Sequence, residues 1–175
     1  MRIVINILFF LSLCSVSAQE QSLGPPAIEF KIKNMGFYVD GTFNKVNIST
    51  NFDADNLDNS YIKGVIQVSS IDTDNKKRDK HLRTADYFDV EKFSTIKLTS
   101  TKIEKKSGNK YQLTAKLTIK KTTKTIVIPL EVRETKSLIL FKSNFSINRL
   151  DYGVGESSWV MSDTVKIEVN FVDKK

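Results

Sequence analysis

The stretch Arg78–Asp89, with the sequence RDKHLRTADYFD, carries charges of both signs and the only histidine of the chain. His81 beside the carboxylates of Asp79 and Asp86 has the residue types of a general acid–base pair. A hydrolase would also need a nucleophile and donors for a developing oxyanion. The chain has no G-x-S-x-G motif, and GESSW at residues 155–159 resembles it only superficially. We therefore predict a polar scaffold or binding rim and no enzyme, with a hydrolase using His81 as the less favoured alternative.

Metal-binding residues are too few for the common transition-metal sites. The chain has one cysteine, Cys14, and one histidine, so several thiolate or imidazole ligands cannot gather. The pairs Asp53/Asp55 and Asp72/Asp74 are typical of turns, in which the side chain bonds to nearby backbone. A calcium loop would need more oxygen ligands at regular spacing and a glycine. We expect no metal and no cofactor.

The first residues have the pattern of a secretory signal peptide. A basic start is followed by the apolar run IVINILFFLSLC and by the small residues SVSA. We expect a signal peptide over residues 1–18, cleaved after Ala18, and a flexible lead-in over residues 19–27. The protein would then be periplasmic or secreted. A lipoprotein anchored at Cys14 is the alternative, which is disfavoured because Leu13, directly before the cysteine, is not small.

Basic residues outnumber acidic ones, 27 to 20, which gives a formal net charge of +7. Most are lysines that alternate with apolar residues, as is typical of the solvated face of strands. Attraction to an anionic ligand, or a transient contact with an anionic membrane surface, is the further interpretation. Nucleic acid is not expected as a partner, because no concentrated arginine or aromatic platform occurs.

Alternating apolar and polar residues dominate the rest of the chain and predict strands with one buried face. In YQLTAKLTIK, every second residue from Tyr111 to Ile119 is apolar. The apolar phase changes near Asn44-Lys45, which predicts a bulge in one long, bent strand. About eight such segments occur in residues 28–173, which we expect to form one domain. Eight antiparallel strands can close as a sandwich or as a barrel.

One segment, NKKRDKHLRTADYFDVEKF, has a helical pattern instead. Leu82, Ala85 and Phe88 recur every three residues and form a narrow apolar stripe. Asp79 and Arg83 are spaced for an ion pair on one helix face. We predict a short helical crossover between the third and fourth strands, covering one end of the β-structure.

The apolar strand faces can either fill the core or surround a cavity. A barrel of about eight strands is the size at which both outcomes occur. Small inward residues, Gly41, Gly64, Ala115 and Ser143, leave room and favour a cavity. The residues that we expect to line it, and to bind a ligand there, are Phe30, Ile32, Phe37, Val39, Phe43, Ile66, Leu98, Leu113, Leu117, Ile128, Phe141, Phe145, Ile167 and Val169.

Several segments resemble the YceI-like family of bacterial polyisoprenoid-binding proteins, over essentially the whole expected mature chain. The similarity lies in FKIKNMGFYVDGTF (30–43), SSIDTDNKKRDKHLRTADYFDVEKF (69–93), LTIKKTTKTIVIPL (117–130) and INRLDYGVG (147–155). The resemblance implies an all-β, eight-stranded antiparallel, lipocalin-like β-barrel in an exported protein, often dimeric, with an isoprenoid lipid in its interior. Two departures from the family pattern, Lys121-Thr122 and Asn34, concern the rim rather than the apolar lining.

We therefore predict a non-enzymatic protein that stores or transports an isoprenoid lipid, either polyprenyl phosphate-like or an isoprenoid quinone. A homodimer is the assembly that the resemblance suggests. The polar residues expected to form the rim and scaffold are Arg78, Asp79, His81, Arg83, Arg149 and Asp151, with the last two as partners of the helical segment. The alternative is a cell-envelope interaction module with a filled core, whose function would lie on its outer surface.

Overall fold

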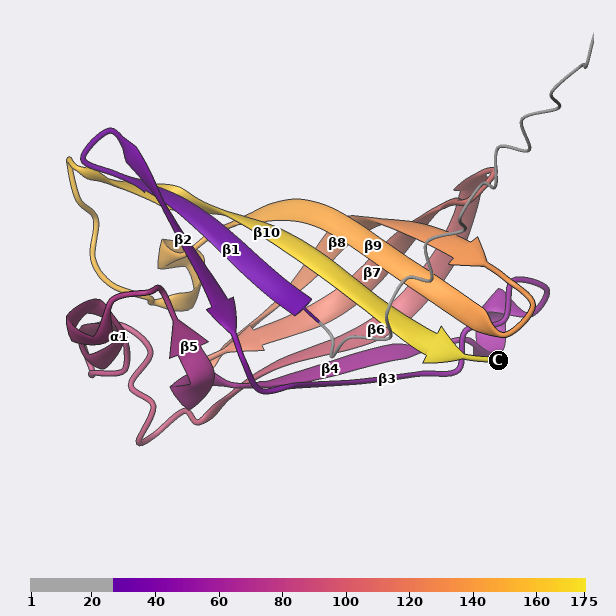
Figure 1. The fold of residues 1–175 in the computed structure, drawn as a ribbon, viewed down its shortest axis with the longest axis horizontal. Coiled ribbons are helices and arrows are strands. Elements are labelled where there is room, and N and C mark those ends of the chain that lie inside the picture. The colour runs from indigo at the N-terminus through magenta and orange to yellow at the C-terminus, as the bar shows by residue number, and fades with distance from the viewer. Residues whose placement is uncertain (1–26) are drawn as a thin grey trace, which may run out of the picture.

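The computed structural model describes residues 27–175, which form one antiparallel β-sheet with little helix (Figure 1). Its ten strands are β1 (Ala27–Asn34), β2 (Phe37–Phe43), β3 (Val46–Thr50), β4 (Ile62–Gln67), β5 (Ile71–Asp72), β6 (Thr95–Ser107), β7 (Lys110–Ile119), β8 (Thr122–Glu134), β9 (Leu138–Asn148) and β10 (Met161–Lys174). The all-β class is confirmed. The expected signal peptide, its cleavage after Ala18, the Cys14 anchor and nearly all of the lead-in lie outside the described residues.

The strand order brings the two ends of the sheet together. The order is β3-β4-β6-β7-β8-β9-β10-β1-β2-β5, and every pairing is antiparallel. β3 directly continues β2 and β5 directly continues β4, while β2 pairs with β5 and β3 pairs with β4. The sheet therefore curls into a barrel-like ring. The structure has ten strands rather than the eight expected, because two long strands are each interrupted by a bend.

The first bend separates β2 from β3 at Asn44-Lys45, the position where the sequence pattern changes phase. Pairing continues across it, because the Asn44 N–H donates to the Ser70 carbonyl at 3.1 Å and the Gln67 N–H donates to the Lys45 carbonyl at 2.9 Å. The second bend is the 3-10 turn η2 (Val68–Ser70) between β4 and β5. Both bends lie side by side and turn the sheet towards closure.

The helical crossover α1 (Lys76–Leu82) lies between β5 and β6 and is shorter than its sequence pattern suggests. Asn75 begins it as an N-cap, with its side-chain oxygen accepting the Arg78 N–H at 3.0 Å. The helix ends at Leu82, so Ala85 and Phe88 lie in turns rather than on a helical stripe. Phe88 instead packs edge-to-face on Phe43, with ring centroids 6.2 Å apart, so tertiary packing decides its place. Two further 3-10 turns are η1 (Leu57–Asn59) and η3 (Leu150–Tyr152).

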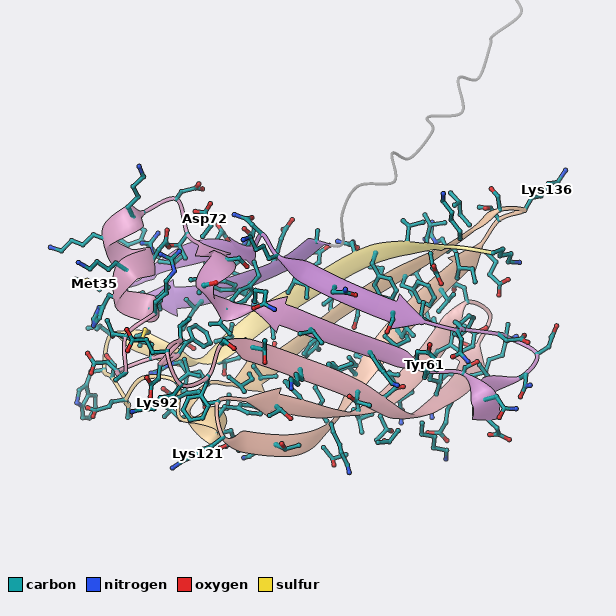
Figure 2. The ribbon with its side chains drawn as sticks, turned by 90° about the horizontal axis from the view of Figure 1, so that it is seen from below. Met35, Tyr61, Asp72, Lys92, Lys121 and Lys136 are labelled. Atoms are coloured by element: carbon teal, nitrogen blue, oxygen red, sulfur yellow. The ribbon has the colours of Figure 1, made fainter. Side chains whose placement is uncertain are left out.

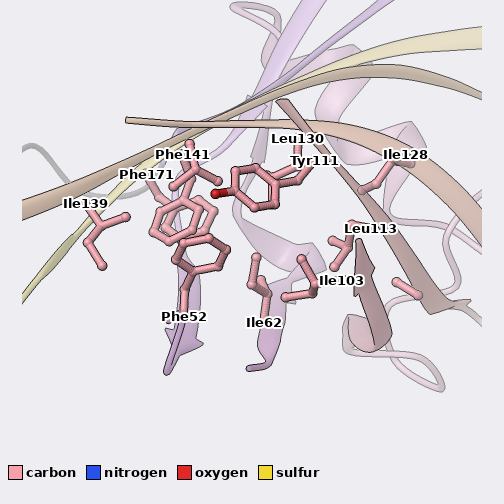
Figure 3. Close-up of a cluster of buried hydrophobic side chains, with 12 residues drawn as sticks. Phe52, Ile62, Ile103, Tyr111, Leu113, Ile128, Leu130, Ile139, Phe141 and Phe171 are labelled. Atoms are coloured by element: carbon pink, nitrogen blue, oxygen red, sulfur yellow. The ribbon is translucent and has the colours of Figure 1, made fainter. Parts of the chain in front are cut away.

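The end of the barrel opposite α1 is filled by four aromatic side chains, which we call the aromatic plug: Phe52, Tyr111, Phe141 and Phe171 (Figure 3). Phe52, from the loop after β3, lies edge-to-face against Tyr111 at 5.3 Å and against Phe141 at 5.5 Å between ring centroids. Phe141 stacks on Phe171 at 4.3 Å. Each ring is almost fully buried, so this end of the interior is solid protein.

Candidate functional site: an apolar cavity with a polar mouth

Beyond the aromatic plug the barrel interior is hollow, with a cavity of about 670 Å³. This volume lies within the range of about 300–1,000 Å³ that is usual for small-molecule sites. Aliphatic and aromatic side chains from the inward faces of the strands form most of the wall. Of the residues expected to line it, twelve do so: Phe30, Ile32, Val39, Phe43, Ile66, Leu98, Leu113, Leu117, Ile128, Phe145, Ile167 and Val169. Their role in binding a ligand stays a prediction.

Two expected lining residues, Phe37 and Phe141, lie elsewhere. Phe37 begins β2 in a hairpin that extends past the mouth, and it is 78% exposed. Phe141 faces inward as its strand pattern predicts, but it belongs to the aromatic plug and does not line the cavity. The alternation shows only which face a residue is on. It does not show how deep along the barrel the residue lies, and depth decides both corrections.

Other lining residues were missed by the sequence analysis. They include Ile28, Ile48, Ile62, Ile71, Leu82, Tyr87, Phe88, Ile96, Ile119, Leu130, Ile147, Val154, Met161, Val165 and Phe171. Some of these carried a usable signal, since Ile119 and Ile147 follow Leu117 and Phe145 two residues later on the same face. Tyr87 and Phe88 lie in irregular turns, where no periodicity marks them.

The mouth is supported by a buried polar cluster between β5 and α1. The Asp79 carboxylate accepts the Thr73 backbone N–H at 3.0 Å and the Thr73 hydroxyl at 2.6 Å. The same hydroxyl accepts from Arg78 Nε at 2.7 Å, and the Arg78 guanidinium also donates to the Thr73 carbonyl at 2.5 Å. Asp79 therefore anchors α1 from behind, while Arg78 lines the cavity. Their roles as rim and scaffold residues of a ligand site stay a prediction.

His81 and Arg83 complete the helical side of the mouth. His81 lines the cavity, with Nε2 3.4 Å from an Asp86 carboxylate oxygen and its ring edge-to-face with Tyr87. Within residues 27–175, no hydroxyl hydrogen-bonds to the His81 ring. Arg83 does not form the expected ion pair with Asp79. Its guanidinium donates to the Ile71 carbonyl at 2.8 Å, because α1 is held against β5 at this point.

Arg149 and Asp151 do not bond to α1 as expected. The buried Arg149 guanidinium donates to the carbonyls of Ser162, Val154 and Glu156 and pairs with Asp163 at 2.8 Å. Asp151 pairs with Lys124 at 2.9 Å. These contacts hold the loop before β10 in place.

The link between the crossover segment and the loop after β9, which we had assigned to Arg149 and Asp151, is made by a lysine. Lys120 Nζ donates to the Tyr87 carbonyl and to the Gly153 carbonyl, each at 2.7 Å. The β7–β8 turn therefore ties the crossover segment to the loop that follows η3. This role had no sequence signal, because Lys120 continues an ordinary strand pattern.

The mouth has a cationic lining. Lys77, Arg78, His81 and Arg149 contribute to the cavity wall, and within residues 27–175 no aspartate or glutamate does. Asp79 and Asp163 lie behind the two arginines and offset part of their charge. Lys77 is exposed and forms no ion pair within the described part of the chain. A positive potential over an apolar opening attracts anionic groups.

The described residues hold neither a cluster of metal ligands nor a membrane-spanning helix. No group of three or more histidine, cysteine, aspartate or glutamate side chains in this range could hold a metal ion. None of the helices in this range is long and apolar enough to span a bilayer.

A curled antiparallel sheet around an apolar cavity defines the class of barrel-like folds to which this chain belongs. The chain is a member of the YceI-like domain family, whose profile matches residues 19–172. The resemblance drawn from the sequence is thereby confirmed. A UPF0312 protein of Photorhabdus laumondii is 39% identical over 106 residues, and one of Vibrio parahaemolyticus is 34% identical over the same length. Each match covers 60% of this chain and only 55% or 56% of the relative.

Solved structures show the same fold. BcnA of Burkholderia cenocepacia matches with a TM-score of 0.81 and 26% identity, over 85% of this chain and 96% of that one. A YceI protein of Campylobacter jejuni matches with a TM-score of 0.72 and 23% identity, over 98% and 99%. A domain of Saccharophagus degradans described as polyisoprenoid-binding matches with a TM-score of 0.66 and 17% identity, over 84% and 92%.

Proposed function

We propose that this protein binds an isoprenoid lipid in its cavity and stores or transports it without catalysing a reaction. The observation that carries the proposal is the hollow, apolar interior of about 670 Å³, closed by the aromatic plug at one end. Membership of the YceI-like family and a structural neighbour described as polyisoprenoid-binding support the same class of ligand. An interaction module with a filled core is disfavoured by the cavity.

The hydrocarbon tail is the part of the ligand that dominates the affinity. Each buried CH₂ contributes about 0.8 kcal/mol, so ten buried carbons contribute about 8 kcal/mol before the costs of association. The apolar side chains of the cavity wall, among them Phe43 and Leu130, offer this surface. The tail would lie along the barrel axis, with its far end against the aromatic plug.

The headgroup would lie at the mouth, and the charges there favour an anionic one. Lys77 and Arg78 line the opening, and no carboxylate does so in the described part of the chain. Charge-assisted hydrogen bonds from such groups are stronger than neutral ones. A polyprenyl phosphate-like lipid fits this mouth better than an isoprenoid quinone, whose headgroup is neutral.

We also propose that the protein works outside the cytoplasm, as the signal-peptide pattern of residues 1–18 indicates. N-terminal sequencing of the protein from a cell-envelope or medium fraction should begin at Gln19. A chain that kept Met1, or one that was lipid-modified at Cys14, would contradict cleavage after Ala18.

The cavity is tested by filling it without removing any contact. Gly64 lies on the inner face of β4, and a Cβ built on it meets only Ile48, at 4.0 Å. Gly64→Phe should place a ring in the cavity. Native mass spectrometry with lipid extraction should find an isoprenoid lipid on the wild-type protein and about tenfold less on the variant.

The matched control is Val65→Phe, which adds the same ring at the neighbouring position on the outer face of β4. It should retain the lipid at the wild-type level. Equal retention by both variants, or a wild-type protein that carries no isoprenoid lipid, would contradict the proposal.

A further inference from the structure

An exposed apolar surface lies at the mouth end of the barrel. We call it the apolar tip: Met35, Phe37, Trp159 and Val160, which are 71%, 78%, 107% and 55% exposed. Its two segments, the β1–β2 turn and the loop before β10, are joined by a hydrogen bond from the Met35 N–H to the Val160 carbonyl at 2.7 Å. Figures 1 and 2 place this turn and α1 at the same end of the long axis, with Tyr61 and Lys136 at the other end.

The apolar tip is unusual because its members are large and lie on two segments that are joined at Met35 and Val160. Single exposed apolar residues are common, whereas a contiguous exposed group marks an interaction surface. Tryptophan, phenylalanine and methionine are residues that insert well into the boundary between lipid headgroups and acyl chains. The Trp159 side chain is fully exposed, so its large apolar surface is not buried within the protein.

Cationic side chains stand beside the apolar tip. Lys33 precedes it on β1, and α1 exposes Lys76, Lys77 and Lys80. Within residues 27–175, none of these four lysines forms an ion pair. Asp79 of α1 is buried and turned inward, whereas Asp74 before the helix and Asp86 beside His81 are exposed, so the three exposed lysines of α1 stand against two exposed carboxylates. The end therefore combines apolar insertion with positive charge.

We propose that the apolar tip and the lysines of α1 form a docking surface for an anionic lipid bilayer. The apolar tip enters the headgroup region while the lysines contact lipid phosphates, because basic residues close to a membrane are attracted to an anionic lipid surface. A second copy of the chain fits this surface less well. A two-fold contact through the same end would bring the lysines of one protomer against those of its partner.

The location gives the surface a use. Asn34 and Met161, the neighbours of the apolar tip in β1 and β10, line the cavity. Docking would therefore place the mouth directly against the lipid surface. An apolar ligand could pass between bilayer and cavity without crossing water. Vesicle binding itself does not depend on the identity of that ligand.

Trp159, the only tryptophan of the chain, reports on docking directly. The purified mature protein is titrated with vesicles of dioleoyl phosphatidylcholine that contain about 30% dioleoyl phosphatidylglycerol. This anionic fraction gives the vesicles a strongly negative surface. The Trp159 emission should shift to the blue, and the protein should sediment with the vesicles. Pure phosphatidylcholine vesicles, or high salt, should weaken binding, because the Debye length shortens from about 10 Å at 0.1 M to about 3 Å at 1 M.

Two variants separate the apolar and the charged parts. Met35→Ser combined with Phe37→Ser should weaken vesicle binding about tenfold. Lys76→Gln combined with Lys80→Gln should remove most of the preference for anionic vesicles. The matched control is Val127→Ser, which removes an apolar side chain that is 58% exposed on the outer wall of β8. It should bind vesicles like the wild type.

Three results would overturn the proposal. One is unchanged Trp159 emission with anionic vesicles at low salt. Another is a Val127→Ser variant whose vesicle binding is weakened as much as that of the Met35→Ser/Phe37→Ser variant. The third is a dimer in size-exclusion chromatography that the Met35→Ser/Phe37→Ser variant turns into a monomer with no change in vesicle binding, since the second copy would then be the partner. The vesicles contain no isoprenoid, so Gly64→Phe should bind them like the wild type. This variant therefore distinguishes a failure of the docking proposal from a failure of the cavity proposal.

Discussion

At the scale of single residues, the polar side chains around the mouth act mainly as structural ties. Asp79 is buried and accepts two hydrogen bonds from Thr73, while the buried Arg149 guanidinium has four acceptors around it. Buried charges with satisfied partners hold loops in one geometry, and they are costly to remove singly because the partner is left unpaired. Asp79 thereby keeps Lys77 and Arg78 at the opening, while Arg149 fixes the loop before β10.

Asp79→Ala should lower the free energy of unfolding by about 2 kcal/mol, because the Thr73 N–H and hydroxyl would lose a charged acceptor in a buried place. Chemical denaturation measures the change. Asp86→Ala is the matched control, since this exposed carboxylate has only a 3.4 Å approach to His81, and its effect should stay within about 0.5 kcal/mol. Equal destabilisation by the two variants would contradict the anchoring role of Asp79.

Tyr152 predicts a pH dependence. Burial, with a smaller effect from the Asp151 charge, raises the pKa of the Tyr152 phenol above its ordinary value. As the pH rises past about 10, the unfolded chain releases this proton before the folded protein does, so folding loses stability with rising pH. The free energy of unfolding should therefore fall between pH 9 and pH 11 less steeply in Tyr152→Phe than in the wild type. Parallel pH profiles would contradict this contribution.

At the scale of elements, β9 shows how one strand serves both the closed and the hollow part of the barrel. Phe141 and Phe145 lie on the same inward face, four residues apart, yet the first belongs to the aromatic plug and the second lines the cavity. Between them Ser143, buried, donates its hydroxyl to the Pro129 carbonyl at 2.5 Å.

The β8–β9 ladder ends close to this serine. It pairs Glu131–Glu134 with Ile139–Lys142 only. Pro129, two residues before the first paired residue, has no N–H to donate, which ends such ladders. The Ser143 hydroxyl supplies a bond to β8 where the backbone pairing has stopped.

The two phenylalanines of β9 should separate stability from ligand binding. Phe141→Ala should lower the free energy of unfolding by about 3 to 5 kcal/mol, because it leaves a void among packed rings, and it should still carry lipid when folded. Phe145→Ala should cost less stability, since its ring borders a space that is already hollow, and should reduce lipid retention more. Denaturation curves and native mass spectrometry on both variants test this contrast. Loss of lipid from Phe141→Ala alone would contradict it.

At the scale of the whole molecule, the barrel has one solid and one hollow end, so the ligand should enter from the side of α1 (Figure 1). Removing the bound lipid should lower the unfolding midpoint of the wild-type protein, because a ligand that binds only the folded state stabilises it. The free energy of unfolding of the lipid-bound protein exceeds that of the lipid-free protein by about 2.7 kcal/mol when the free lipid concentration is a hundred times the Kd. Thermal unfolding before and after delipidation measures this. In Gly64→Phe, delipidation should change nothing, whereas an equal shift would place the lipid outside the cavity.

Family membership and much of the architecture could be predicted from the sequence. The segments around Arg78–Asp89 and residues 147–155 carried the resemblance to the YceI-like family, which the family profile confirms. The bend at Asn44-Lys45 was visible as a phase change. The length of the helical crossover was not, because Phe88 has a helical spacing from Leu82 but is drawn into the interior by Phe43.

The sequence by itself determined the all-β class and the inward face of nearly every strand, because the side chains of a strand alternate with a period of two residues whatever the strand packs against. Only the tertiary structure decided how deep each inward residue lies. Phe141 fills the aromatic plug, Phe145 borders the cavity and Phe37 stands outside in water, and nothing in their local pattern distinguishes them. Depth depends on how the curled strands are staggered and on which loops return over their ends, and these are long-range contacts that no local period records.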